Sequence, residues 1–246
     1  RNAIASGIDV DIRDPDGWTA LIRATFWNHE TAVSLLLSLN ADINAQSIDG
    51  YTPLFWPIRK NYKNLVSSLV SRGASLDTKT DTGMKPIHWA AMNGDLGVLD
   101  LGSLDILISA GAGVNDADNR GEAPLHYAVQ QLHEARAKYL ISHGADVNAK
   151  DHQGKTPLFR ASSYGSYKMV DLLISVGADI NRPNNRGETP LHYAVVNSDE
   201  LMVQHLIKRG ADVNAKDNAG ISPYQRALLS ENKRIIRLFK RTWWFF

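Results

Sequence analysis

Glycine residues recur along this chain at an almost constant interval, and this interval constrains the fold more than any other feature of the sequence. The successive spacings are 33, 33, 38, 33, 33 and 33 residues, between Gly17, Gly50, Gly83, Gly121, Gly154, Gly187 and Gly220. A fixed period of this length is typical of small structural repeats that stack in a row, each packing only against its neighbours.

Two short sequence patterns keep the phase of these glycines. The first begins at the glycine itself and is clearest in residues 187–192, which read GETPLH; related copies begin at Gly121 and Gly154. The second closes each unit and is clearest in residues 177–181, which read GADIN. Two linked patterns that stay in phase over most of the chain exclude chance repetition and indicate one structural unit per period.

The local physics of residues 148–180 predicts a pair of helices for each unit. Thr156 can cap a helix, and Pro157 can take the first helical position, where its missing N–H costs nothing. After this short inner helix and a turn, residues 167–176 carry apolar side chains at helical spacing and predict a second, outer helix. Gly177 can end that helix in the left-handed conformation. A unit this small cannot bury its own apolar face, so neighbouring units must stack.

The Thr-Pro-Leu-His tetrad, repeated with a spacing of 33 residues, resembles the ankyrin repeat. The resemblance implies an all-α solenoid of seven helix–turn–helix units with connecting β-hairpin loops, and it makes residues 1–246 a single ankyrin-repeat domain. Residues 1–10 look like the tail of a truncated repeat. The seven predicted repeats are residues 11–43, 44–76, 77–114, 115–147, 148–180, 181–213 and 214–246.

The predicted repeat of residues 77–114 is five residues longer than the others. The excess is a local echo, because residues 96–100 (LGVLD) are followed by residues 101–105 (LGSLD). It falls before the predicted outer helix, so we place it in the loop between the two helices. We interpret it as a tolerated insertion, since a longer surface loop costs little free energy. A partner-specific contact loop is the alternative.

The bulk composition excludes several classes of function. The 27 basic and 26 acidic residues leave a net charge of +1, which argues against a dedicated nucleic-acid-binding protein. The absence of cysteine excludes disulfides, thiolate nucleophiles and cysteine zinc sites. No apolar run is long enough to span a bilayer and no secretory signal is visible, so we expect a cytoplasmic protein, with the nucleus as the alternative. Because the first residue is Arg1, we expect the true N-terminus to lie further upstream.

Three histidines, His88, His126 and His192, occupy the last position of the tetrad and most resemble metal ligands. Stacked repeats lie about 10 Å apart, which is too far for shared zinc ligation at about 2 Å. In the family this histidine is similar to a structural residue that bonds near the tetrad threonine, and we interpret it so here. The sequence therefore predicts no metal, no cofactor and no catalytic residue, and we do not expect an enzyme.

Other apparent motifs are explained better by the repeat. Residues 111–113 (GAG) lack the third glycine of a dinucleotide-binding loop and fall on the closing pattern. The recurrent asparagines of the closing pattern, Asn148, Asn181 and Asn214, are interpreted as turn residues. Hydroxylation, for which this asparagine can be a target in the family, is the alternative.

The positions that the resemblance places on the binding face change character along the chain. The residue after the repeated glycine is Trp, Tyr and Met in the first three repeats, and Glu, Lys, Glu and Ile in the rest. Tryptophan, tyrosine, methionine and arginine are enriched at the centres of protein interfaces. We therefore predict an aromatic groove for a peptide or a protein surface; the alternative is that the rings pack against one another or against a missing repeat. The predicted partner-binding residues are Trp18, Phe26, Trp27, Tyr51, Trp56, Arg59, Lys60, Met84, Trp89 and Met92.

The leading hypothesis for function is a protein–protein interaction scaffold that binds a partner protein or peptide on the concave face of the stack. The alternative is a regulatory or targeting module cut from a larger enzyme, channel or membrane-associated protein. We expect the apolar side of the last helix to cap the preceding repeat and its basic side to face solvent. A second domain, a partner or a membrane surface is expected to cover the apolar end, which consists of Trp243, Trp244, Phe245 and Phe246.

Overall fold

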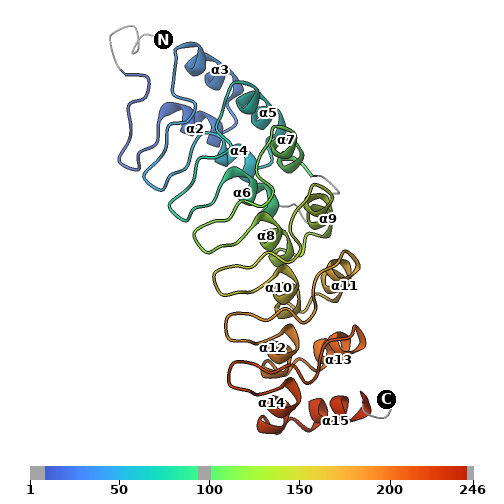
Figure 1. Cartoon of the computed structure of the whole chain (residues 1–246). Helices are drawn as coiled ribbons and strands as arrows, with labels where there is room; N and C mark the ends of the chain where they lie inside the picture. The colour runs from blue at the N-terminus through green and yellow to red at the C-terminus, as the bar shows by residue number, and fades with distance from the viewer. Residues whose placement is uncertain (1–8, 94–100, 243–246) are drawn as a thin grey trace. The chain divides into compact units, whose positions relative to one another are not determined.

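The computed structural model describes residues 9–93 and 101–242, and all regular secondary structure within these ranges is helical. The helices are short and come in pairs (Figure 1), which confirms the predicted all-α repeat fold. We call the first helix of each pair the inner helix and the second the outer helix. The inner helices are α2 (Ala20–Phe26), α4 (Phe55–Arg59), α6 (Pro86–Met92), α8 (Pro124–Gln130), α10 (Pro157–Ser163), α12 (Pro190–Val196) and α14 (Pro223–Leu229). The outer helices are α3 (Glu30–Ser38), α5 (Lys63–Ser71), α7 (Ser103–Ser109), α9 (Glu134–Ser142), α11 (Tyr167–Ser175), α13 (Glu200–Lys208) and α15 (Lys233–Thr242).

The chain divides into two compact units: unit 1 comprises residues 1–124 and 138–144, and unit 2 comprises residues 125–137 and 145–246. Within unit 1, the inner helices α2, α4 and α6 lie side by side, and each packs against the outer helix of its own pair. Within unit 2, α10, α12 and α14 form the same kind of row, beside α11, α13 and α15. In each unit the loops that join one pair to the next extend from the side of the inner helices (Figure 1).

The inner helices begin where the tetrad predicts. The Thr156 hydroxyl accepts the N–H of Phe159 at 3.2 Å, and Pro157 stands at the first helical position, so two of the free N–H groups of a helix start are accounted for. The exception is α4, which starts at Phe55 and has five residues. Pro57 has no N–H to donate to the preceding turn, so the helix begins later there.

The core of each unit lies between its inner and outer helices. In unit 2, Leu158 and Phe159 of α10 and Leu173 of α11 are all 0 % exposed. Burying a side chain of this size stabilises the fold by about 1.5–3 kcal/mol. Because such residues recur at helical spacing on both helices of a pair, each helix can bury one side against the other helix of its pair and another side against the next pair.

Each loop between pairs is closed by a short set of hydrogen bonds. In the loop before α10, the Asp151 carboxylate accepts the N–H groups of Gln153 and Lys155, both at 2.8 Å. The Lys155 carbonyl in turn accepts the Asp151 N–H at 3.0 Å. These bonds reverse the chain as a hairpin of the predicted kind, although no strand is assigned in the part of the chain that the structure describes.

Successive hairpins are joined by one backbone hydrogen bond per step. In unit 2, the Asn185 N–H donates to the Gln153 carbonyl at 2.9 Å. The equivalent donor and acceptor pairs are Ile48 and Asp16 (3.2 Å), Asp81 and Asp49 (3.1 Å), Asn119 and Thr82 (3.1 Å), and Asn218 and Arg186 (3.0 Å). The hairpins of each unit therefore stand in register, a few ångströms apart.

The repeated glycine stands where neighbouring hairpins approach most closely. Gly154 has a φ of +76°, and a Cβ at this position would lie 2.6 Å from the backbone nitrogen of Asn185. Gly220, in the last hairpin, has the same φ of +76°, but no described atom lies within 4 Å of a Cβ added there. The glycine period thus meets two demands, a left-handed turn and the approach of the next repeat, and only the first acts at Gly220.

The recurrent asparagines do more than the turn-forming role predicted for them. Asp146 makes the turn, because its carboxylate accepts the Asn148 N–H at 2.9 Å. The side chain of Asn148 instead reaches the next repeat, where its Oδ1 accepts the Asp179 N–H at 2.8 Å. Asn181 repeats this bridge to Asp212 at 2.8 Å. The residue lies in a turn, as predicted, and its side-chain amide also satisfies the backbone of the neighbouring loop.

In the third repeat, α6 ends at Met92 and α7 begins at Ser103. Residues 96–100 lie outside the described residues. The last three residues of the echo, 103–105, belong to α7 rather than to the loop.

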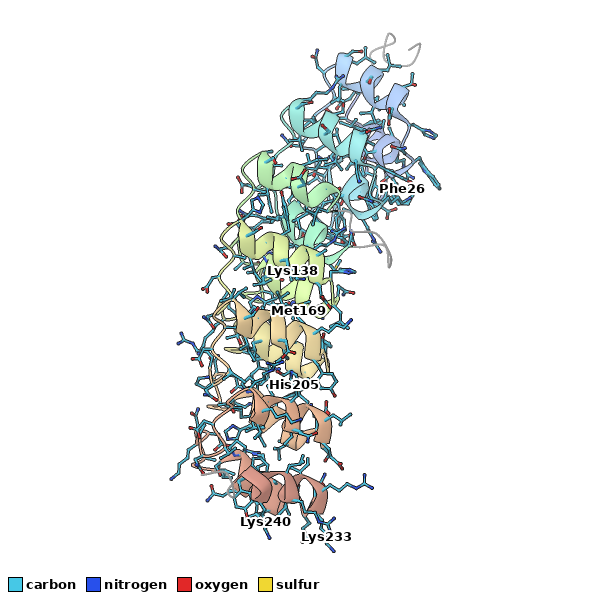
Figure 2. The ribbon with its side chains drawn as sticks, turned by 90° about the vertical axis from the view of Figure 1, so that its right-hand side faces the viewer. Phe26, Lys138, Met169, His205, Lys233 and Lys240 are labelled. Atoms are coloured by element: carbon cyan, nitrogen blue, oxygen red, sulfur yellow. The ribbon has the colours of Figure 1, made fainter. Side chains whose placement is uncertain are left out.

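The last helix, α15, packs against α13 and α14. Ile235 and Phe239 are 0 % exposed, so its apolar side caps the preceding pair as expected. The side chains of Lys233, Arg234, Arg237 and Lys240 are exposed, and Figure 2 labels Lys233 and Lys240. The residues Trp243, Trp244, Phe245 and Phe246 lie outside the described residues.

The tetrad histidines form hydrogen bonds at the starts of the inner helices. His192 Nε2 donates to the Ile221 carbonyl at 3.0 Å, and its Nδ1 accepts the Thr189 N–H at 3.1 Å. Because a carbonyl only accepts and a backbone N–H only donates, the ring is neutral with its proton on Nε2. The Thr189 hydroxyl also lies 2.9 Å from Nδ1, which confirms the structural role predicted for this histidine.

Burial keeps two of these rings neutral. His88 and His192 are both 0 % exposed. Desolvation lowers the pKa of His88 and of His192 below the ordinary value, and the nearby carboxylates Asp118 and Asp217, which favour the protonated ring, do not overcome it. In the last repeat Gln225 takes the same position without a titratable group, and its side-chain oxygen accepts the Ser222 N–H at 2.9 Å.

Replacing Gly154 by alanine should destabilise the protein more than replacing Gly220. Both variants place an L-residue in the left-handed region, which costs about 1–2 kcal/mol. Gly154→Ala also drives a Cβ into the Asn185 backbone, and we expect about 1–3 kcal/mol more for this overpacking. Urea unfolding followed by circular dichroism measures both free energies. Equal losses would show that the neighbouring hairpin does not select glycine.

The free energy of unfolding should fall as the pH is lowered below about 6.5, the ordinary histidine pKa. In that range the unfolded chain binds protons at His88 and His192 while the folded chain does not, so acid favours unfolding. The slope is at most about 1.4 kcal/mol per pH unit for each histidine. In the variant His88→Gln/His192→Gln, which gives both repeats the residue type that Gln225 provides in the last one, this slope should decrease. An unchanged slope, measured by urea titration at each pH, would contradict the assignment.

Candidate partner-binding surface

A cluster of aromatic rings runs along the inner helices and hairpins of unit 1. We call it the aromatic cluster; it comprises Trp18, Phe26, Trp27, Tyr51, Phe55, Trp56 and Trp89. Phe26, which is labelled in Figure 2, belongs to the half of the cluster that Trp18, Phe26, Trp27 and Trp56 form. Its centroid lies 5.5 Å from that of Trp18 and 4.9 Å from that of Trp56, with edge-to-face geometry. Trp18 and Trp56, which belong to successive repeats, are 5.2 Å apart.

Tyr51 links this half of the aromatic cluster to the third repeat. Its centroid lies 5.4 Å from Trp56, 5.8 Å from Trp89 and 5.7 Å from Phe55. All these separations fall in the range at which aromatic pairs attract each other beyond simple burial. Phe55 was not among the predicted site residues, because it occupies the last position of the tetrad, where other repeats have His88, His126 and His192, and this position was interpreted as structural.

The exposure of the predicted residues divides them into three groups. Trp27 is 62 % exposed and Arg59 is also exposed. Met84 and Trp89 are only 7 % and 9 % exposed, so they support the surface from below. The others, which are half-buried, are Trp18, Phe26, Tyr51, Trp56, Lys60 and Met92. The rings do pack against one another, which was the alternative considered from the sequence, yet they also leave one edge open to solvent.

Two cations lie over the aromatic cluster. The Lys60 ammonium is 3.6 Å from the centroid of Phe26 and donates to the Phe26 carbonyl at 3.1 Å. The Arg59 guanidinium lies 5.5 Å from the Trp56 centroid and 5.4 Å from that of Trp89. Among the described residues, neither cation has a carboxylate within ion-pair distance. Their positive charge is therefore held by ring faces and remains uncompensated at the surface.

A second set of cations is neutralised within its own repeat, a feature that the sequence reasoning missed. Arg160 of α10 binds the Asp151 carboxylate of the preceding hairpin at 2.7 Å. Arg226 binds Asp217 in the same way. Arg23 binds Asp14 and also lies over the Trp18 ring, at 5.5 Å from its centroid. In each case the acid precedes the arginine by nine residues.

The ionisation of two of these hairpin acids, Asp14 and Asp217, is favoured by their neighbours. Burial of the Asp217 carboxyl disfavours its charge, but hydrogen bonds from the Ile221 N–H and from Arg226 outweigh burial and lower the pKa of Asp217. The pKa of Asp14 is lowered for the same reasons, through the Trp18 N–H and Arg23. These arginines therefore serve the hairpins as permanent counter-ions and offer little charge to a partner.

Unit 2 has a hollow of 440 Å³ between two hairpins and an inner helix. His152 and Lys155 line it from one hairpin, and Arg186 and Glu188 line it from the next. Tyr193 of α12 lies on the inner-helix side. The hollow shows that the face formed by hairpins and inner helices is indented in this unit as well as polar. None of its residues was singled out as a contact residue from the sequence.

Comparison with known proteins agrees with this architecture. The model of the family described as ankyrin repeats (3 copies) matches residues 2–80, 65–151, 99–184 and 148–217. The sequence comparison with curated proteins finds no match. Among solved structures, the crystal structure of the ankyrin repeat domain of Bcl-3, described as a unique member of the IkappaB protein family, is similar, with a TM-score of 0.78 and 26% sequence identity. The alignment covers 92% of this chain and 99% of that one.

No helix in the described part of the chain is both long and apolar enough to cross a membrane. The matched segments together span residues 2–217, and the helix pairs from α2 and α3 to α12 and α13 lie inside them. Ankyrin repeats are typically non-catalytic modules that bind other proteins. On the combined ground of sequence, architecture and similarity, this chain belongs to the ankyrin-repeat family.

Proposed function

We propose that this chain is a non-catalytic scaffold that binds a partner protein or peptide on the hairpin and inner-helix face of unit 1. The observation that carries the proposal is the open edge of the aromatic cluster, where Trp27 is 62 % exposed beside Lys60 and where Arg59 lies over Trp56 and Trp89. Neither cation has a carboxylate partner among the described residues. Exposed tryptophan and arginine side chains of this kind contribute most of the free energy at protein interfaces.

The geometry favours binding because the side chains are already held in place. Trp27 packs edge-to-face on Phe26, with centroids 5.0 Å apart, and the Lys60 ammonium lies 5.4 Å from the Trp27 ring. Arg59 is held between two tryptophan rings. A partner would therefore find these groups with little side-chain entropy left to lose, and that loss is one of the main costs of association. Met84 and Trp89, which are buried, act as the support of the surface in this proposal.

The proposal covers the remaining aspects of function in the same terms. The seven predicted repeats, residues 11–246, act as one binding domain, in the cytoplasm or the nucleus, with a protein or peptide as partner and no nucleic acid. The similarity to the ankyrin repeat domain of Bcl-3 supports a binding role. A regulatory or targeting module within a larger protein would use the same surface.

The test begins by immobilising the whole chain and using it to capture proteins from a cell extract. The most abundant captured protein is then purified. Its affinity is then measured for the wild type, Trp27→Ala and Arg59→Ala. We expect each variant to bind at least about tenfold more weakly, the effect of losing a hot-spot side chain. Circular dichroism should show that both variants keep their helical content.

The matched control is Tyr164→Ala. Tyr164 follows α10 as Trp27 follows α2, and it is 43 % exposed, but it lies in unit 2. Its removal should leave the affinity unchanged if unit 1 holds the contact. Full affinity in folded Trp27→Ala and Arg59→Ala variants would rule out the aromatic cluster as the binding surface.

A further inference from the structure

The hollow of unit 2 contains a cation that is held by rings rather than by an acid. The Lys155 ammonium lies 5.7 Å from the centroid of Phe159 and 5.6 Å from that of Tyr193. The nearest acid on its own hairpin, Asp151, is already engaged, because its two oxygens bind Arg160 at 2.7 Å and the Lys155 backbone N–H at 2.8 Å. Within the described residues, Lys155 has no ion-pair partner, so its charge is directed to the hollow uncompensated.

A second cation reaches the hollow from the neighbouring hairpin. Arg186 is exposed and lines the hollow, and no described carboxylate lies within ion-pair distance of its guanidinium. Its backbone is fixed, since its N–H donates to the Asn184 side chain at 2.8 Å and its carbonyl accepts the Asn218 N–H at 3.0 Å. His152, also exposed, adds a ring whose nitrogens can donate a hydrogen bond from the opposite hairpin.

The hollow contains one carboxylate, and that carboxylate is bound to its own hairpin. Glu188 Oε2 accepts a hydrogen bond from the Asn184 side-chain amide at 3.0 Å. The oxygen of the same amide accepts the Glu188 N–H at 3.0 Å. Glu188 is thus held by hydrogen bonds to Asn184 and pairs with neither cation. The lining therefore has two uncompensated cations against one restrained anion, and its net charge is positive before any contribution from His152.

From this arrangement we infer that the hollow of unit 2 binds an acidic side chain, a glutamate or aspartate in an extended segment of a partner protein. The carboxylate lies between Lys155 and Arg186, and its methylene groups rest against the Tyr193 ring. A planar guanidinium matches a carboxylate with paired hydrogen bonds, and a charge-assisted bond of this kind is stronger than a neutral one. The inference rests on the proposed scaffold function and adds the chemistry of a second contact, in a different unit from the aromatic cluster.

The probe for this site is a short blocked peptide in which glutamate alternates with serine, together with a matched peptide in which glutamine replaces every glutamate. Each peptide is titrated into the 246-residue chain while backbone amide NMR shifts are followed. The glutamate peptide should shift resonances of His152, Lys155, Arg186 and Glu188 in a saturable way. The glutamine peptide should bind at least about tenfold more weakly, because the charge-assisted bonds are lost.

Three variants separate charge recognition at this site from general attraction of an acidic peptide. Lys155→Met keeps the alkyl stem on the rings but removes the charge, and it should weaken binding about tenfold. Glu188→Gln removes the one opposing charge and should tighten binding. Lys168→Met, on the outer helix α11 at an exposed position, loses the same charge elsewhere and should bind like the wild type.

Four results would overturn the inference: no saturable shift up to the solubility limit of the glutamate peptide, equal binding of the two peptides, equal weakening in Lys155→Met and Lys168→Met, or weaker binding in Glu188→Gln. The variant Trp27→Ala keeps this test apart from that of the aromatic cluster. It should bind the acidic peptide normally while losing the captured partner. If Trp27→Ala loses the captured partner and the wild type does not bind the glutamate peptide, only the acidic site is refuted. If Trp27→Ala keeps the captured partner and the wild type binds the glutamate peptide, only the aromatic surface is refuted.

Discussion

A single backbone hydrogen bond between neighbouring hairpins sets the register on which the other features of each unit depend. In unit 2 it joins the Asn185 N–H to the Gln153 carbonyl at 2.9 Å. It brings the two hairpins so close together that only glycine fits at position 154. The same register places the hairpin of one repeat beside the inner helix of the next. Trp18 and Trp56, or Tyr51 and Trp89, can therefore meet at 5.2 Å and 5.8 Å although they come from different repeats.

Two classes of cation on the hairpin and inner-helix face differ in what holds them. Arg160 and Arg226 bind acids of their own hairpins and so belong to the structure of the repeat. Arg59, Lys60 and Lys155 lie over aromatic rings. A ring face positions a cation but does not cancel its charge. The first class stabilises hairpins, and the second leaves directed positive charge at the surface.

Much of the fold could be predicted from the sequence because its causes are local. The tetrad specifies a cap and a first helical residue, so the start of α10 follows from Thr156 and Pro157 alone. The late start of α4 also has a local cause in Pro57, although the tetrad by itself suggested an earlier one. The structural role of His192 followed from the resemblance, but the bridge from Asn148 to Asp179 did not, because it joins loops whose distance only the stack defines.

The candidate site was harder to predict, since exposure depends on neighbours from other repeats. Met84 and Trp27 both occupy positions expected at the surface, yet one is 7 % and the other 62 % exposed. The arginine–aspartate pairs could have been found by comparing two equivalent positions across the repeats, because the acid stands nine residues before the arginine each time. The hollow around Lys155 had no such signal, because its charge balance depends on whether Glu188 pairs with Asn184 or with a cation.

The two ways of holding a cation make folding and association respond differently to dissolved salt. The attraction between the Lys60 ammonium and the Phe26 ring acts over 3.6 Å, a distance too short for dissolved ions to enter between them. The electric field that the same ammonium directs toward a partner, in contrast, passes through water. At physiological ionic strength such a field decays over about 8 Å. Added electrolyte should therefore leave the aromatic scaffold intact while shortening the range over which an acidic partner is drawn toward it, so that ionic strength acts mainly on the rate of encounter.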